Sequence, residues 1–289
     1  MERMSITLDE LIKDLDDLVS LPGVFTRINQ MVDDPNCSIT EMGEVISQDP
    51  GLTTRLLRMA NSAMYGLRTE IDTVSKAVTV IGVQKLRDLV LATAAVDAFD
   101  GIPNEIITME DFWMHSLYCA LISKQLSDQL KLPQSDTLFV AGLLHDLGHL
   151  VMFKRIPEAS KKILIHSMEE AELPDLYLAE QKLIGFDHAM VGSKLAEHWH
   201  FPQILTDTIR YHHQPEDAPQ NNKQVAIIHI ANTLAVLAEL NTFDIEETDA
   251  PAIHPQAWQV TGLTEAIIPE VVTSAREQYS DMRTSLFLK

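Results

Sequence analysis

The sequence predicts an all-α fold of two helical lobes, and three observations lead to that prediction. Apolar residues recur every three to four positions along most of the chain, which is the period of a helix buried on one face. Gly and Pro number 11 and 13 among 289 residues, about 8% where about 12% is average. No stretch of useful length alternates apolar and polar residues as a half-buried strand does.

Six helices are predicted in the first hundred residues, and capping residues mark the start of two of them. Ser38 and Glu41 have the spacing of a capping box. Asp49 followed by Pro50 is typical of an N-cap and a first helical position. The six helices are expected over residues 8–19, up to about 32, from 38, from 49, over 74–81 with Gly82 as the stop, and from about 86.

A break at residues 100–104, Asp-Gly-Ile-Pro-Asn, is predicted to divide two helical lobes of about 1–100 and 104–240. Thr108 is expected to cap the first helix of the second lobe. Its helices are predicted over about 108–131, 135–154, from Pro157, from Pro174, and over 188–199, 202–213 and 225–240. The C-terminal segment, residues 241–289, is expected to be partly helical, from about Pro269.

The charge of the chain excludes two classes of partner. There are 22 Lys and Arg against 42 Asp and Glu, a net charge of −20. Such a surface repels phosphate backbones and anionic lipid head groups, so we expect neither direct nucleic-acid binding nor membrane binding. The two cysteines form no disulfide framework, and the first residues lack the basic and apolar regions of a signal peptide. A cytoplasmic location is therefore expected.

One predicted helix combines burial with polar side chains. Residues 141–152 are apolar on every side except at His145, Asp146 and His149, and such a helix is expected to be buried. A buried carboxylate is costly unless it is paired, so Asp146 requires a cation, a metal or strong hydrogen-bond donors. A structural Asp–His pair in the core would meet the same requirement and remains an alternative.

Four other predicted helices carry polar residues on their apolar stripes. These residues are His115, His188, the pair His212 and His213, and Asn232 beside His229. Neutral imidazoles together with one carboxylate are a ligand set for a divalent transition metal. The expected cofactor is such a metal, Fe or Mn rather than Mg.

The order of these residues resembles the HD superfamily of metal-dependent phosphohydrolases, and especially its HD-GYP branch. The resemblance implies a set of metal ligands made of His115, His145, Asp146, His188, His212 and His213. In active enzymes of this superfamily, such ligands hold metals that polarise phosphate and supply hydroxide at neutral pH. The candidate catalytic residues are Asp146 and His149.

Motifs in the first half are similar to those of the HDOD domain, an HD-related helical module of bacterial signalling proteins. They are Leu21-Pro22, Gln48-Asp49-Pro50-Gly51-Leu52, the run Leu56-Leu57-Arg58-Met59-Ala60-Asn61-Ser62, and Tyr65-Gly66. The pattern continues through Trp113, Glu180, Gly185, Trp199 and Pro202, so the resemblance covers residues 15–213. It implies an HD-like second lobe and a regulatory role exerted through contacts with signalling proteins.

Three departures from the HD-GYP pattern argue against hydrolysis of cyclic di-GMP. Asn232 stands where the last metal-binding aspartate is expected, and an amide supplies no negative charge. His149 replaces a lysine, and Gln214-Pro215 replaces a glutamate with no Gly-Tyr-Pro after it. The sequence therefore predicts a regulatory module with a site for a metal or a phosphorylated small molecule. A metal-dependent phosphohydrolase or phosphodiesterase is the alternative.

Overall fold

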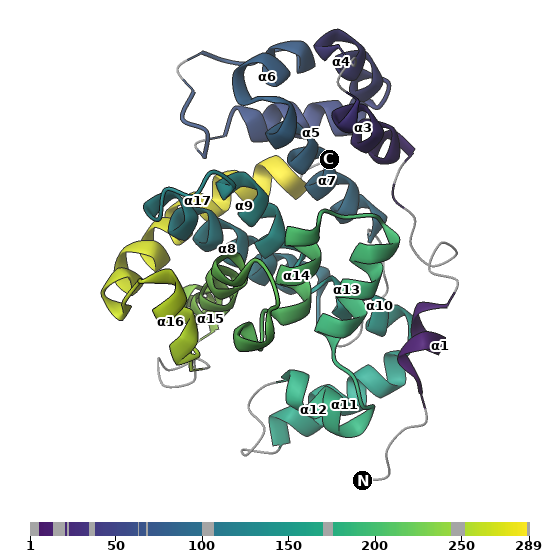
Figure 1. Ribbon diagram of the computed structural model, residues 1–289, viewed down its shortest axis with the longest axis vertical. Coiled ribbons are helices and arrows are strands. Elements are labelled where there is room, and N and C mark those ends of the chain that lie inside the picture. The colour runs from purple at the N-terminus through teal and green to yellow at the C-terminus, as the bar shows by residue number, and fades with distance from the viewer. Residues whose placement is uncertain are drawn as a thin grey trace. The chain divides into compact units, whose positions relative to one another are not determined.

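The computed structural model describes residues 6–13, 21, 23–34, 38–62, 64–67, 69–99, 107–169, 176–243 and 252–287, and these residues form helices and no strand (Figure 1). The all-α prediction is confirmed. The chain forms two compact units. One consists of residues 1–18 and 101–273, and the other of residues 19–100 and 274–289.

In the unit that contains residues 19–100, two helices begin where capping residues predict, and the helix expected from about residue 86 begins at Val83. Its helices are α3 (Gly23–Asp33), α4 (Ile39–Ser47), α5 (Pro50–Ala60), α6 (Val74–Ile81) and α7 (Val83–Ala98). Ser38 and Glu41 form the predicted capping box of α4, with the Glu41 amide donating to Ser38 Oγ at 3.1 Å. Asp49 Oδ1 accepts from the amide of Leu52 at 3.0 Å and so caps α5. Gly82, at a φ of 89°, separates α6 from α7.

The unit that contains residues 101–273 carries the polar residues singled out above. Its helices are α1 (Leu8–Ile12), α8 (Met109–Gln129), α9 (Ser135–Leu144), α10 (Leu147–Arg155), α11 (Pro157–Glu169), α12 (Leu176–Leu183), α13 (His188–His198), α14 (Gln203–Tyr211), α15 (Asn222–Phe243) and α16 (Pro255–Thr261). Helix α8 packs against α9 and α15, and α13 packs against α10 and α14 (Figure 1). A last helix, α17 (Ile268–Phe287), begins within one residue of the predicted start.

One predicted helix is interrupted. Residues 135–154 were expected to form a single helix, but α9 ends at Leu144 and α10 begins at Leu147, with a turn at His145 and Asp146. The stretch Ser135–Arg155 is long and apolar enough to cross a membrane, yet 89% of its most apolar window is buried inside the protein, as in a core helix. The turn places two predicted site residues at a junction of helices in the core.

Some expectations fall on residues outside the described ranges. These are the break at residues 100–104 and the helix start at Pro174. The helix predicted over residues 8–19 is wrong in its end, because α1 ends at Ile12 and Lys13 is extended, with a ψ of 137°. Helix α16 was not predicted from the sequence.

Two glycines allow helices to approach closely around the turn. A Cβ atom added to Gly148 would lie 1.9 Å from the carbonyl oxygen of His188, at the start of α13. A Cβ atom on Gly142 would lie 2.8 Å from backbone atoms of Ala120 in α8. The side chains of larger residues would force these helices apart, so the glycines set the distance between the turn and its neighbours.

Candidate metal centre

The five histidines predicted as ligands gather around the carboxylate of Asp146, the sixth predicted ligand. They come from separate elements: His115 from α8, His145 and Asp146 from the turn before α10, His188 from the first residue of α13, and His212 and His213 from the end of α14. The side chains of His145, His188 and His212 are at most 2% exposed, and that of Asp146 is 14% exposed. The site is therefore assembled in the interior by the packing of four helices.

One group of ligand atoms surrounds Oδ1 of Asp146. Nε2 of His188 lies 3.3 Å from this oxygen, and Nε2 of His212 lies 3.5 Å from it. Nε2 of His188 is also 3.3 Å from Nε2 of His212 and 2.9 Å from Nε2 of His213. One ligand atom from each of these three histidines and from Asp146 thus lies within 4.8 Å of the others.

A second group surrounds the other oxygen of Asp146. Nε2 of His145 lies 3.2 Å from Oδ2, and Nε2 of His115 lies 3.9 Å from it. The single carboxylate is therefore shared between two groups of potential ligands.

Hydrogen bonds at Nδ1 orient three of the imidazole rings. Nδ1–H of His145 donates to the carbonyl oxygen of Gly142, and Nδ1–H of His212 donates to that of Ile209, both at 2.8 Å. Nδ1 of His188 lies 2.7 Å from Oε2 of Glu180. A proton held on Nδ1 leaves the lone pair of a neutral ring on Nε2, facing Asp146, which is the usual arrangement of metal-binding histidines.

Two observations indicate that the residues present fit a metal ion. Asp146 Oδ1 and His145 Nε2 are buried without a hydrogen-bond partner, and such orphaned atoms are rare and costly in protein interiors. In addition, a metal with bonds of about 2.0–2.2 Å holds neighbouring ligand atoms about 2.9–3.5 Å apart. The four distances given for the Oδ1 group, 2.9 to 3.5 Å, have this spacing.

The pKa values of the histidines divide them into two classes. Burial lowers the pKa of His212 to about 4 and holds that of His213 well below its usual range. Burial also disfavours the charged form of His188, but the charge of Glu180 outweighs it and raises the pKa of His188 to about 10. In the metal-free protein His212 and His213 are therefore neutral ligands at pH 7, whereas His188 carries a proton.

His115 is held by two residues of α15. Its Nε2 lies 2.8 Å from Oδ1 of Asn232, and its Nδ1 lies 2.6 Å from Oε1 of Glu239. Burial would lower the pKa of His115, but the charge of Glu239 prevails and raises it to about 9. His115 is therefore an imidazolium that donates from both nitrogens, and Asn232 lies where the family pattern has an aspartate.

His149 does not join the Asp146 groups. Its Nδ1 lies 3.3 Å from Oε1 of Glu180, and its ring stacks on that of His188 with 3.8 Å between centroids. With Glu180 and His188 it forms a third, fully buried group of potential ligand atoms.

Sequence reasoning missed the roles of Glu180 and Glu239. Glu180 belonged to the family pattern but was not recognised as the partner of His188. Glu239 follows Asn232 by seven residues, or two helical turns, so both lie on one face of α15. That spacing is the signal that could have found it.

Comparison with known proteins identifies the family. A family model described as the HDOD domain matches residues 18–215. A curated relative from Treponema pallidum (strain Nichols), named only as an uncharacterized protein, is 29% identical over 220 residues. The match covers 75% of this chain but 42% of the relative, so the chain spans less than half of that protein.

Solved structures match over nearly the whole chain. An HDOD domain protein of unknown function from Geobacter sulfurreducens is 26% identical with a TM-score of 0.73, and the match covers 96% of this chain and 98% of that one. A protein from Shewanella amazonensis SB2B, provisionally named a phosphohydrolase, is 27% identical with a TM-score of 0.74, covering 96% and 97%. A provisionally named signal transduction protein from Marinobacter aquaeolei VT8 shares the fold at 21% identity and a TM-score of 0.70, covering 98% and 61%.

Proposed function

The chain belongs to the HDOD domain family, and from that premise we propose that it is a regulatory signal-transduction module whose HD-like lobe binds a divalent transition metal at Asp146. His188, His212 and His213 complete the ligand set. The observation that carries the proposal is the grouping of these three histidines with Asp146, each offering a ligand atom within 4.8 Å of the others, around Oδ1, a buried oxygen without a hydrogen-bond partner.

The proposal of regulation rather than turnover rests on the second group. A second metal there would need the lone pair of His115 Nε2, but that atom lies 2.8 Å from Asn232 and its ring is held in the charged form by Glu239. Asn232 brings no negative charge to offset another cation. One complete site and one blocked site suit a single metal that stabilises one conformation of the protein. Signalling proteins would recognise that conformation by direct contact.

The donor set favours Fe or Mn over Mg as the metal. Three imidazoles and one carboxylate are softer ligands than the oxygen sites that Mg²⁺ prefers. When bound, such a metal polarises phosphate oxygens and lowers the pKa of bound water. The chain's own residues hold it, and Glu180 keeps the ring of His188 in place.

Elemental analysis of protein purified without chelators tests this proposal. We expect a stoichiometric transition metal in the wild type and its loss in both Asp146→Ala and His212→Ala. The matched control is His198→Ala, an exposed histidine at the end of the helix that His188 begins. A folded wild-type protein that takes up no added Mn²⁺ or Fe²⁺ would overturn the proposal.

A metal-dependent phosphohydrolase or phosphodiesterase is the second candidate. It is favoured by the sharing of Asp146, whose two oxygens each face a different group of ligand atoms, as in sites that hold two metals. The name of the Shewanella amazonensis relative points the same way. Turnover of nucleotides or cyclic dinucleotides with added Mn²⁺ or Fe²⁺, abolished in Asp146→Ala, would favour this candidate over regulation.

A further inference from the structure

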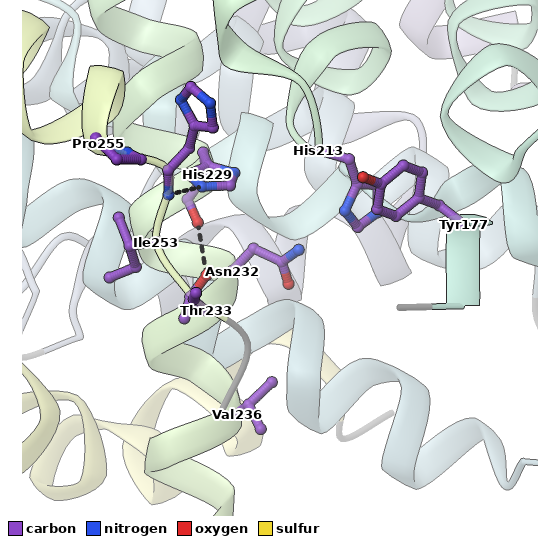
Figure 2. A pocket seen from close by; sticks show the side chains of 10 residues that line it. Tyr177, His213, His229, Asn232, Thr233, Val236, Ile253 and Pro255 are labelled. Atoms are coloured by element: carbon purple, nitrogen blue, oxygen red, sulfur yellow. Dashed lines mark hydrogen bonds between the residues drawn. The ribbon is translucent and has the colours of Figure 1, made fainter. Parts of the chain in front are cut away.

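Tyr177 stacks on His213, one of the four proposed ligands of the metal at Asp146. The two rings are nearly parallel, with an angle of 13° between their planes and 4.4 Å between their centroids. Figure 2 shows the ring of Tyr177 over that of His213, where both side chains line the same pocket. Tyr177 is the second residue of α12, so this contact connects the metal centre to a helix that carries none of the four ligands.

The stack restrains the torsion that directs the Nε2 lone pair of His213. Hydrogen bonds at Nδ1 orient the rings of His145, His188 and His212. The ring torsion of a histidine side chain is broad, so an unrestrained ring does not keep its Nε2 in one direction. Rotation of the His213 ring would bring its edge into the face of Tyr177. The stack therefore gives His213 a fixed ring plane, as the hydrogen bonds do for the other three rings.

The ring of His213 also contacts the rings of His188 and His212, with 4.8 and 4.0 Å between centroids. Both of these histidines are proposed ligands, so their own rings must adjust to the same metal ion. Tyr177 is not among the proposed ligands. It can therefore orient His213 from outside the ligand set.

Glu180 fixes the place of Tyr177. The two residues are three positions apart and lie on one face of α12. Oε2 of Glu180 lies 2.7 Å from Nδ1 of His188, and the side chain of Glu180 is buried. Helix α12 is thus attached to the metal centre at two ligands, at His188 through Glu180 and at His213 through Tyr177.

The stack is expected to be stronger when a metal is bound. A metal ion at Nε2 withdraws electron density from the imidazole, which gives the ring a partial positive charge. The face of a phenol ring is electron-rich and attracts positive charge. Because this additional attraction exists only in the metal-bound state, it raises the affinity for the metal as well as orienting the ligand.

We propose that Tyr177 is a positioning residue of the metal centre, which orients His213 through its ring and so raises the affinity of the site for a divalent transition metal. This inference rests on the metal centre proposed above. It gives α12 a direct role in metal binding.

Co²⁺ binding to the full chain tests the inference, because the visible absorption of bound Co²⁺ reports the geometry of its ligands and competition with a chelator gives the affinity. Tyr177→Leu removes the ring but keeps an apolar side chain. We expect it to bind Co²⁺ about two- to tenfold more weakly, the effect of losing one aromatic pair, and to change the visible spectrum. Tyr177→Phe keeps the ring and is expected to retain the affinity and the spectrum of the wild type. Tyr279→Leu, the same substitution in α17, is the matched control.

A double-mutant cycle separates this role from a merely structural one. In the background of His213→Ala, which leaves three proposed ligands, Tyr177→Leu is expected to weaken Co²⁺ binding no further. Tyr177→Met, which also lacks a ring, takes the place of Tyr177→Leu if that variant does not fold.

Three results would overturn the role of Tyr177 and leave the metal centre standing. They are an equal loss of affinity in the wild-type and His213→Ala backgrounds, wild-type affinity and spectrum in Tyr177→Leu, and a loss in Tyr177→Phe as large as in Tyr177→Leu. Failure of the wild type to bind Co²⁺ would overturn the metal centre and this inference with it.

Discussion

Oε2 of Glu180 lies 2.7 Å from Nδ1 of His188 and 2.8 Å from the backbone nitrogen of the same residue. One carboxylate oxygen thus holds both the ring and the first turn of α13. Glu180 is 1% exposed and belongs to α12, so the position of one proposed ligand depends on the docking of a second helix. This makes Glu180 a positioning residue for the metal centre.

Glu180→Gln is expected to weaken metal binding by about 10- to 100-fold, the usual effect of losing a residue that orients a ligand. The amide keeps the size of the side chain but loses the charge that favours the proton on Nδ1 of His188. Competition with a chromogenic chelator measures the affinity. Glu197→Gln, an exposed position of α13, is the control. An unchanged affinity would show that Glu180 serves only the fold.

Gly148→Ala is expected to lower the free energy of unfolding by about 1–3 kcal/mol, the usual cost of overpacking, and also to weaken metal binding. The new Cβ atom would lie 1.9 Å from the carbonyl oxygen of His188, so the start of α13 must move away from the Asp146 turn. Urea unfolding and metal content measure the two effects. Gly23→Ala, whose Cβ atom would meet nothing within 4 Å, is the control. If Gly148→Ala is destabilised but binds metal with wild-type affinity, the expected effect of this packing contact on the geometry of the ligands is wrong.

The sequence singled out most of the proposed ligands because they interrupt apolar stripes, a pattern visible one helix at a time, whereas His213 entered only through the resemblance to the HD superfamily. It could not predict their partners in the same way. Glu180 and His188 lie on different helices, and no spacing within either helix indicates their contact. The interruption of the helix predicted over residues 135–154 could not be predicted either. Apolar residues continue on both sides of His145 and Asp146, and neither of these turn positions is Gly or Pro.

The contact between residues 252–255 and His229 could not be predicted from the sequence for another reason. Residues 252–255 form no regular element, and a backbone N–H, that of His254, makes their bond to His229. A backbone group leaves no trace in the side-chain pattern. The helical framework was accessible by contrast because caps such as Ser38 and Asp49 act within three residues of themselves.

Asn232→Asp is expected to raise the metal content above that of the wild type. The new carboxylate would lie beside Nε2 of His115 and supply the negative charge that a second cation requires. Elemental analysis at matched free Mn²⁺ measures the change, and hydrolysis assays on the same sample reveal any turnover gained. Asn222→Asp, at the first residue of the same helix, is the control. A metal content equal to that of the wild type would mean that His115 and Glu239 block the second group by themselves.

Metal binding near pH 7 is expected to release protons and to weaken as the pH falls. His188 has a pKa of about 10 in the metal-free protein, so its Nε2 can become a ligand only after the ring loses a proton. His212 and His213 have lowered pKa values and release none. Calorimetry of Mn²⁺ binding in buffers of different ionisation enthalpy counts the protons. Heats that do not depend on the buffer would contradict this protonation state.

The chelator-treated protein is expected to be most stable near pH 6.5, with a loss on both sides. The pKa of His188 is raised from 6.5 to about 10, chiefly because the charge of Glu180 outweighs burial, so its contribution is full below pH 6.5 and disappears as the pH rises toward 10. Burial lowers the pKa of His212 from 6.5 to about 4, so the unfolded chain binds an extra proton between these values and stability falls with the pH. Glu180, with a pKa lowered from 4.5 to about 2 because the neighbouring histidines outweigh burial, adds a further loss below pH 4.5.

Melting temperatures across this range measure the acid and alkaline limbs of this stability profile. His188→Gln is expected to reduce the alkaline loss but not to abolish it, because His115, with a pKa raised to about 9, keeps its own contribution. The variant is also expected to reduce the loss below pH 4.5, because Glu180 no longer has a charged His188 beside it. An alkaline limb equal to that of the wild type would contradict the assigned pairing of His188 with Glu180.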